Sequence, residues 1–244
     1  MKTVINTLLN GKVKIVQFET GLKVSSDAVL VASAIDEKII KKSATILDVG
    51  VGGGGISLCT AYRFKNVKIT GIDIQNEMLE LAKQSCIENG FDDRIELINE
   101  NILNPSKQFK EKSFDIVITN PPYYTGQSCS DKIKAIAHNE TGIDLKDWIL
   151  SSVKRLNATG TFIVIHKADR LDDIIYSLKK ANMGKIEIFL LYSKKGEIAN
   201  RVIVRAKKSN KSPSVIYPPI VLHKENGEYT DRAKSLLCDG KAIG

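Results

Sequence analysis

A strand-forming segment that leads directly into a cluster of glycines, and then into a helix, constrains this 244-residue chain more than any other feature. The apolar run Thr45–Val49 ends in the glycine-rich turn 50–55, and residues 56–62 are apolar and compatible with a helix. Glycines let the backbone approach a ligand closely, and a helix N-terminus offers free N–H groups. The segment therefore predicts an α/β fold that binds a nucleotide-type cofactor at the turn.

Two cofactor classes are compatible with these glycines. Positions 50, 52 and 55 match the dinucleotide pattern G-x-G-x-x-G. The pattern D-x-G-x-G-x-G of S-adenosylmethionine enzymes is matched by Asp48, Gly50, Gly52 and Gly54. Asp48 favours S-adenosylmethionine, because the ammonium group of its methionine end needs a negative or carbonyl partner where a dinucleotide places pyrophosphate.

Two further strands follow in the sequence, and each ends near residues that suit part of a nucleoside. Val67–Asp73 ends in an acid about 20 residues after the glycines, where a ribose-binding carboxylate belongs. Ile95–Asn99 is followed by Asn101 and Ile102, an amide and an apolar side chain that suit an adenine ring. Both strand ends are therefore candidates for the cofactor site.

A fourth strand, Phe114–Thr119, ends in Asn120-Pro121-Pro122-Tyr123. Neither proline can donate to a sheet ladder, so these residues must leave the sheet in a loop at the carboxyl end of the strand. In an open α/β sheet, this edge is where ligands bind. An amide, two rigid imides and an aromatic ring suit a planar, nitrogen-bearing target there.

The remaining patterns predict the flanking elements. Short extended pieces surround a turn at Asn10-Gly11, and Ser25-Ser26-Asp27 can cap a buried helix over 28–35. The later elements are expected to be a helix over 145–156, a turn at 158–160, a strand over 161–166, a helix over 171–181, a strand pair over 186–192 and 202–206, and a helical piece near 230–238.

No repeat or linker divides the chain, so residues 1–244 are expected to form one domain. In this interpretation an N-terminal extension over 1–43 packs on the cofactor site. Residues 44–206 form a Rossmann-like core, and residues 207–244 form a C-terminal tail. The polar loop 125–143 is long for a compact domain, and the sequence does not fix its role.

Composition excludes several classes of protein. No apolar run approaches the roughly 18 residues of a membrane span, and the N-terminus lacks a signal-peptide pattern, so we expect a cytoplasmic protein without a membrane partner. The four cysteines are scattered, with no Cys-x-x-Cys pair, and no metal site is expected. A net charge of +8 favours a polyanionic partner. The oligomeric state stays open, with a monomer slightly favoured.

With glycines after the first strand, an acid after the second and Asn-Pro-Pro-Tyr after the fourth, the chain resembles the class I S-adenosylmethionine-dependent methyltransferases that methylate amino groups. Within them it is similar to the bacterial tRNA adenine-N6-methyltransferases that modify the adenine beside the anticodon of a valine tRNA. The other stretches that carry the likeness are Ser25–Leu30, Tyr124, Ala137–Glu140, His166–Leu171 and Arg201–Arg205. The resemblance implies a Rossmann-like, mostly parallel central sheet with a late antiparallel strand and helices on both faces.

The resemblance also implies roles for single residues. The cofactor would be bound by Asp27, Asp48, Gly50, Gly52, Gly54, Asp73, Ile74, Asn101, Ile102 and Asn120. Asp73 would bind the ribose hydroxyls, and Asn101 would meet the adenine where many relatives carry Asp. The catalytic residues would be Asn120, Pro121 and Tyr123, with the Asn120 amide oxygen and the Pro121 carbonyl accepting from the target amine and the Tyr123 ring stacking on the base.

The function implied is methyl transfer from S-adenosylmethionine to the exocyclic N6 of an adenine in tRNA. Other interpretations remain open: a protein glutamine N5-methyltransferase, whose target is also a planar NH2, an rRNA base amino-methyltransferase, a non-catalytic RNA-binding protein or an NAD-binding oxidoreductase. Five lysines around the late strand pair are candidates for contacts with tRNA phosphates: Lys194, Lys195, Lys207, Lys208 and Lys211. A lysine-rich genome composition is the alternative explanation for them.

Overall fold

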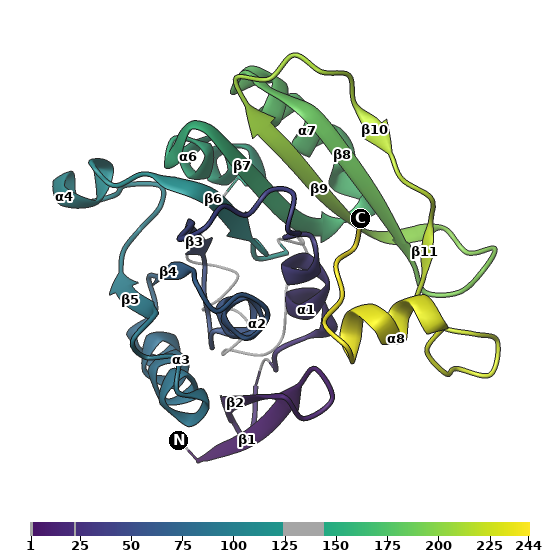
Figure 1. Cartoon of the computed structure of the whole chain (residues 1–244), viewed down its shortest axis with the longest axis horizontal. Helices are drawn as coiled ribbons and strands as arrows, with labels where there is room; N and C mark the ends of the chain where they lie inside the picture. Colours follow the sequence, from purple (N-terminus) through teal and green to yellow (C-terminus); the bar gives the residue numbers. More distant parts are fainter. Residues whose placement is uncertain (1, 22, 124–143) are drawn as a thin grey trace.

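The computed structural model describes residues 2–21, 23–123 and 144–244, and one mixed β-sheet organises this part of the chain (Figure 1). The order of its described strands is β10-β8-β9-β7-β6-β3-β4-β5, with β11 also paired to β8. Their bounds are β3 (Thr45–Val49), β4 (Lys68–Asp73), β5 (Ile95–Asn99), β6 (Phe114–Thr119), β7 (Leu156–Lys167), β8 (Met183–Tyr192), β9 (Ala199–Lys208), β10 (Val215–Ile216) and β11 (Ile220–Val221). β9 runs antiparallel to β7 and β8, and the other described pairs are parallel.

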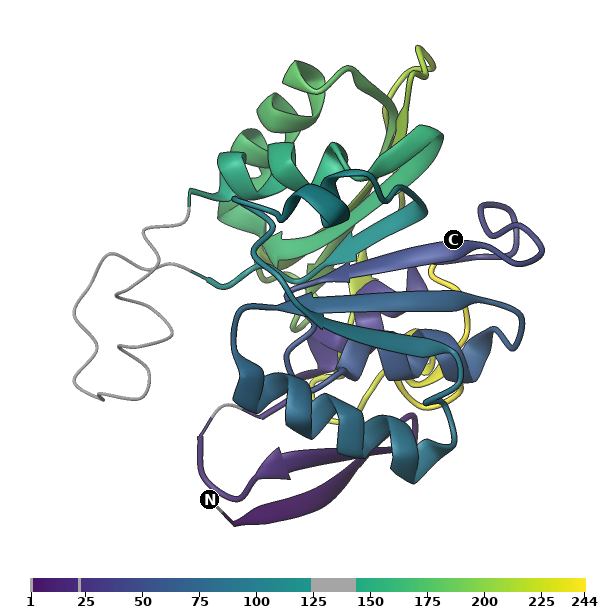
Figure 2. The same ribbon diagram turned by 90° about the vertical axis from the view of Figure 1, so that its left-hand side faces the viewer.

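Helices cover both faces of this sheet (Figure 2). One face carries α1 (Ser26–Ser33), α2 (Gly55–Arg63), α3 (Asn76–Asn89) and α8 (Asp231–Leu237), and the other carries α4 (Lys107–Lys110), α6 (Leu145–Val153) and α7 (Leu171–Lys180), which the short 3-10 helix η1 (Ala168–Arg170) precedes. Successive residues of β3 alternate between the two cores, Ile46 on the α1 and α2 side and Leu47 on the α6 and α7 side. A continuous apolar strand is what burial on both faces requires.

The order of the strands creates a switch point beside β3. After β3 the chain adds β4 and β5 on one side, and β6 and β7 then follow on the other side. Val49 at the end of β3 pairs with Thr119 at the end of β6. The turn 50–55 and the segment that starts at Asn120 therefore leave the sheet side by side, at the edge where α/β sheets bind ligands.

An N-terminal hairpin lies next to this edge. Its strands β1 (Thr3–Leu8) and β2 (Val13–Phe18) are antiparallel, and β2 is bonded to α3. The Val16 backbone N–H donates to Ser85 Oγ at 2.9 Å, and the Lys14 N–H donates to Asn89 Oδ1 at 2.9 Å. These bonds fix the hairpin against the helix that follows β4.

The C-terminal residues join both the sheet and a helix layer. β10 and β11 extend the sheet beside β8, and α8 packs against α1. The Ile243 N–H donates to the Ser33 carbonyl at 2.9 Å, which ties the end of the chain to the end of α1. Figure 1 shows this yellow segment next to the purple α1.

The predicted fold class is confirmed, with the mostly parallel sheet, the antiparallel β9 and helices on both faces. Two local predictions are wrong. The helix expected over 145–156 ends at Val153, and the turn expected at 158–160 lies inside β7. The register against β6 shifts between Phe114 and Ile116, so this stretch is a strand irregularity and not a turn between elements.

Candidate active site

A cavity of about 500 Å³ lies at the carboxyl ends of β3 and β6. Its walls come from β2, the segment before α1, the glycine turn, α3, the residues after β6 and the start of β9. Of the residues predicted for the site, six line it: Asp27, Gly50, Gly52, Asn120, Pro121 and Tyr123. The structure thus brings together residues from three distant parts of the sequence.

The glycine turn has a backbone that other residues adopt poorly. Gly50, Gly52 and Gly54 have φ of 72°, 52° and 93°. A Cβ at Gly50 would stand 3.2 Å from the Trp148 ring, and one at Gly55 would stand 2.5 Å from Val24 Cγ2. The turn can therefore pack between α6 and the segment before α1 only because it lacks side chains.

Asp48 lies beneath this turn and does not line the cavity. Its side chain is fully buried, and Oδ2 accepts from the Ser57 N–H at 3.1 Å and from Ser57 Oγ at 2.7 Å. Its Oδ1 has no partner among the described residues. Burial raises the pKa of Asp48 to about 7, against the effect of the two Ser57 bonds. The carboxylate thus holds the first turn of α2 in place.

Asp73 is bonded to the same turn. Its Oδ2 accepts from the Gly52 N–H at 2.9 Å, and its Oδ1 accepts from the Gln75 N–H at 3.0 Å. Burial raises the pKa of this carboxyl above its ordinary value, although the backbone bonds act in the opposite direction. Asp73 therefore links the end of β4 to the glycine turn.

Besides Asp48, five predicted residues stand outside the wall of the cavity: Gly54, Asp73, Ile74, Asn101 and Ile102. Gly54 begins α2 as its N-cap, and Ile74 is 47% exposed just after β4. Asn101 Oδ1 accepts from the Leu103 N–H at 2.9 Å, and Ile102 is buried in the core on the α6 side. Ile74, Asn101 and Ile102 follow β4 and β5, on the other side of β3 from Asn120.

Asn120 directly follows β6 and lines the cavity together with the glycine turn and Tyr123. Its side-chain Oδ1 is buried without a hydrogen-bond partner among the described residues, an expensive state unless a ligand supplies a donor. The residue before it is fixed firmly: Thr119 Oγ1 donates to the Val49 carbonyl at 2.7 Å and accepts from Trp148 Nε1 at 3.0 Å. Asn120 therefore presents a free acceptor from a rigid support.

Tyr123 makes contacts that the sequence did not predict. Its hydroxyl donates to Asp27 Oδ2 at 2.9 Å, and the same oxygen accepts from Arg201 Nε at 3.1 Å. The Arg201 guanidinium lies 4.8 Å from the centre of the Tyr123 ring, and the His166 ring meets it edge-on at 4.9 Å. Arg201 lies 174 residues from Asp27, so no local pattern signals its presence in the site.

His166, at the end of β7, is buried, and its Nδ1 has no partner among the described residues. Burial, followed by the nearby charge of Arg170, lowers the pKa of His166 to about 4. The imidazole is therefore neutral at physiological pH and adds no charge beside Tyr123. Of the family-like stretches, Tyr124 and Ala137–Glu140 lie outside the described residues, as does the loop 125–143.

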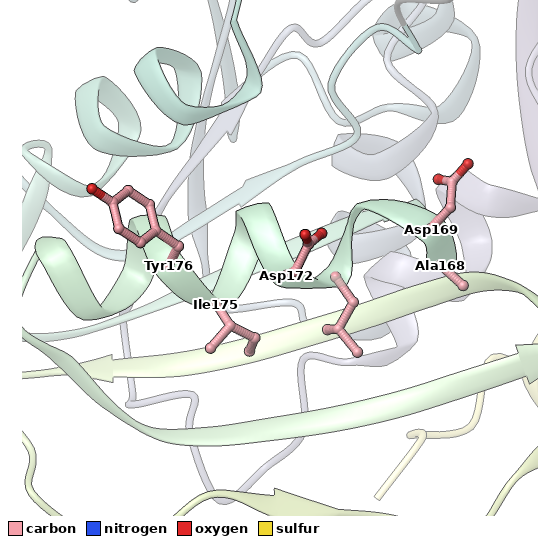
Figure 3. A pocket seen from close by; sticks show the side chains of 6 residues that line it. Ala168, Asp169, Asp172, Ile175 and Tyr176 are labelled. Carbon is pink, nitrogen blue, oxygen red and sulfur yellow. The ribbon is translucent and has the colours of Figure 1, made fainter.

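A second hollow, of about 680 Å³, lies against η1 and α7 (Figure 3). Its lining residues are Ala168, Asp169, Leu171, Asp172, Ile175 and Tyr176. None of the predicted site residues lies there. Among the residues that the structure describes, no three His, Cys, Asp or Glu side chains are grouped to hold a metal ion. No helix within the same residues is long and apolar enough to cross a bilayer.

Comparisons with known proteins find methyltransferases that are similar to this chain. The chain is 29% identical to a tRNA1(Val) (adenine(37)-N6)-methyltransferase of Phocaeicola vulgatus, over 77% of this chain and 78% of that protein. It is 27% identical to an rRNA N(6)-adenosine-methyltransferase of Caenorhabditis elegans, over 69% and 72% of the two chains.

Similar structures and a family model identify the fold and the family. A crystal structure of a predicted O-methyltransferase from Agrobacterium tumefaciens has a TM-score of 0.73 and 25% identity, and covers 89% of this chain and 98% of its own. A family model described as "Methyltransferase domain" matches residues 40–214, which is more than half of the chain. This chain therefore belongs to the methyltransferase domain family.

Proposed function

We propose that this protein transfers a methyl group from S-adenosylmethionine to the exocyclic N6 of an adenine in tRNA. The observation that carries the proposal is the buried, unpartnered Oδ1 of Asn120 beside the glycine turn. An amine that enters the cavity would supply the missing donor. The similar P. vulgatus protein is named for this reaction at adenine 37 of a valine tRNA, and we propose the same target here.

The residues present are suited to S-adenosylmethionine, which would supply a methyl group already activated on a sulfonium. The glycine turn forms part of the cavity wall, where a ligand would meet its backbone, and the first turn of α2 starts at its end. In this proposal Asp73 would bind the ribose hydroxyls, and Ile74, Asn101 and Ile102 would meet the adenine. Asp48 would act from below, by holding the turn through Ser57 and adding negative charge.

The protein's own groups would contribute by holding the target amine in line with the methyl group. Asn120 Oδ1 and the Pro121 carbonyl would each accept a hydrogen bond from the target amine, which favours its pyramidal and electron-richer form. The Tyr123 ring would stack on the flipped base, at a contribution of about 1 to 3 kcal/mol. Rigid support of Asn120 by Thr119 and Trp148 matters because an error of about 1 Å in such a site is costly.

A second substrate is favoured by one comparison. The similar C. elegans protein is named for N6 methylation of rRNA adenosine, so rRNA is the alternative acceptor.

Residues 1–43 contribute Asp27 and strand β2 to the cavity wall, which supports our proposal that they form an extension of the cofactor site within one domain. A cytoplasmic location is proposed from the same tRNA-modifying role.

The test is to incubate the protein with S-adenosylmethionine labelled on its methyl group and with total RNA, purified tRNA or total protein. We expect label in the tRNA fraction. Label in rRNA alone would support the alternative acceptor, and label in protein, as methylglutamine, would contradict the proposal. Tight binding of NAD and none of S-adenosylmethionine in calorimetry would contradict the cofactor.

A further inference from the structure

Tyr123 is held on several sides by residues from distant elements. Asp27 comes from the start of α1, His166 from the end of β7 and Arg201 from the start of β9. β7 and β9 are neighbours in the sheet, with His166 paired to Val202 and Lys167 paired to Arg201. The arrangement therefore depends on the tertiary fold and not on the loop that carries Tyr123.

Each contact removes a different freedom of the ring. The bond from the hydroxyl to Asp27 Oδ2 fixes the far end of the side chain, and the guanidinium lies over one face of the ring, 4.8 Å from its centre. The edge-on His166 at 4.9 Å restricts rotation of the ring plane. A ring that stacks on a base must stand at one angle to it. Removing any of these restraints would therefore lower the fraction of molecules in which the Tyr123 ring has that orientation.

Asp27 links two of these contacts through one oxygen. Its Oδ2 accepts from both Tyr123 and Arg201, at 2.9 and 3.1 Å. The Asp27 side chain is 11% exposed and that of Arg201 is 28% exposed, so solvent screens this ion pair only in part. The carboxylate thus holds the guanidinium over the ring while it binds the hydroxyl.

We propose that Asp27 and Arg201 are positioning residues that hold Tyr123 for capture of the target base. This inference rests on the proposed function, because it assigns a task to the stacking ring. It replaces a direct cofactor role for Asp27, whose Oδ2 is committed to Tyr123 and Arg201. Arg201 supplies a planar cation that a lysine cannot reproduce on the ring face.

A double-mutant cycle tests the proposal. Asp27→Asn and Tyr123→Phe are made singly and together, and kcat/KM for tRNA is measured with saturating S-adenosylmethionine. Asp27→Asn is expected to lower kcat/KM about tenfold alone and about threefold in the Tyr123→Phe background, where only its hold on Arg201 is left to lose, a coupling normal for residues in contact. Most of the loss should appear in KM for tRNA, and Arg201→Lys should lose activity in the same way.

The matched control is the cycle of Asp172→Asn and Tyr176→Phe, an aspartate and a tyrosine on α7 that share no described hydrogen bond. Its two changes should be additive. If Asp27→Asn lowered kcat/KM by the same factor in both Tyr123 backgrounds, the positioning role would be overturned and the proposed function left intact. A loss of S-adenosylmethionine affinity in calorimetry, without coupling, would make Asp27 a cofactor ligand instead. A wild-type protein that methylates no adenine N6 would overturn the proposed function, and the positioning role with it.

Discussion

Burial of the Asp48 carboxyl makes the stability of the whole protein depend on pH. In the folded state burial raises the pKa of this carboxyl from 3.8 to about 7. Between these values the folded protein keeps a proton that the unfolded chain has released. The stability contributed by Asp48 therefore falls as pH rises from about 4 to about 7, by about 1.4 kcal/mol for each unit of pKa difference.

Asp48→Asn should remove this pH dependence. The amide oxygen can still accept from Ser57, and no charge then has to be buried at neutral pH. Thermal unfolding without cofactor, measured from pH 4 to 8, should show a flatter profile for the variant than for the wild type. Asp93→Asn is the control, because that side chain is 77% exposed and its charge remains solvated. An unchanged slope in Asp48→Asn would show that the buried carboxyl does not titrate in this range.

Two substitutions of Tyr123 distinguish the contribution of its ring from that of its hydroxyl. Tyr123→Ala should raise KM for tRNA by about 5- to 160-fold, the equivalent of about 1 to 3 kcal/mol for one stacked base. Tyr123→Phe keeps the ring and loses the bond to Asp27, so its loss should be smaller. Steady-state kinetics compare the two with Tyr176→Ala, which changes an exposed ring on α7. Equal losses for Ala and Phe would mean that the ring face is not used.

At the scale of elements, β9 divides the five candidate lysines into two groups. Lys194 and Lys195 precede this strand, on the side of Arg201 and the cavity, whereas Lys207, Lys208 and Lys211 lie at or beyond its other end. Ten strand residues span about 30 Å. The five lysines therefore lie at both ends of β9, and one RNA surface beside the cavity would include only the first group.

The two groups should differ in the salt dependence of tRNA binding. Changing Lys194 and Lys195 to Gln should reduce the slope of log affinity against log salt by about one for each phosphate that the variant no longer neutralises. Changing Lys207 and Lys211 to Gln removes as many charges at the opposite edge and should leave the slope unchanged. Filter binding over a range of salt concentrations makes the comparison. If both double variants kept the wild-type slope, neither group of lysines would mark the RNA surface.

The sequence predicted those elements whose signal is local. β3, β5 and β6 begin and end at the expected residues, because each is a short apolar run bounded by turn residues. β10 and β11 have two residues each and are defined only by pairing with β8, which no local pattern shows. In the site, Asn120 and the glycines were predicted from motifs. Arg201 and His166 were not, because their roles arise where β7 and β9 meet Tyr123.

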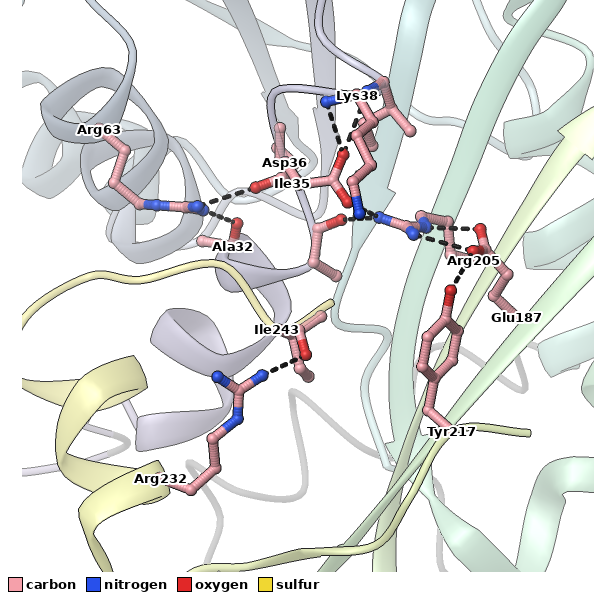
Figure 4. Close-up of polar contacts among 12 residues, drawn as sticks. Ala32, Ile35, Asp36, Lys38, Arg63, Glu187, Arg205, Tyr217, Arg232 and Ile243 are labelled. Carbon is pink, nitrogen blue, oxygen red and sulfur yellow. Dashed lines mark hydrogen bonds and ion pairs between the residues drawn. The ribbon is translucent and has the colours of Figure 1, made fainter. Parts of the chain in front are cut away.

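At the scale of the whole molecule, one buried ionic network joins the N-terminal extension, the sheet and the C-terminal segment (Figure 4). Arg205 on β9 is 4% exposed and donates to both oxygens of Glu187, at 2.8 and 3.0 Å, and to Asp36 Oδ2 at 2.8 Å. The Tyr217 hydroxyl donates to Glu187 at 2.9 Å. Burial raises the pKa of Glu187, but the bonds and charge of Arg205 outweigh it and hold this pKa below its ordinary value.

Arg205→Met should destabilise the protein by about 3 to 5 kcal/mol, because it leaves two buried carboxylates without their partner. Urea unfolding at pH 7 measures the loss, and Lys207→Met, two residues along β9 and exposed, should cost less than about 0.5 kcal/mol. Since the pKa of Glu187 is lowered in the folded state, its contribution is present above the ordinary value of 4.5 and fades as pH falls below it. The difference between wild type and Arg205→Met should therefore shrink in acid, and a loss that stays constant at low pH would contradict this account of the network.

The central claim is that Asn120 presents its free oxygen to an adenine N6 in tRNA. The direct measurement is mass spectrometry of nucleosides from tRNA treated with S-adenosylmethionine and wild type, Asn120→Ala or the exposed control Asn66→Ala. We expect N6-methyladenosine from the wild type and the control. Asn120→Ala should give little product and yet bind S-adenosylmethionine with unchanged affinity, since the interaction acts mainly in the transition state. A methylated ring nitrogen or guanine from the wild type, or full activity in Asn120→Ala, would contradict the claim.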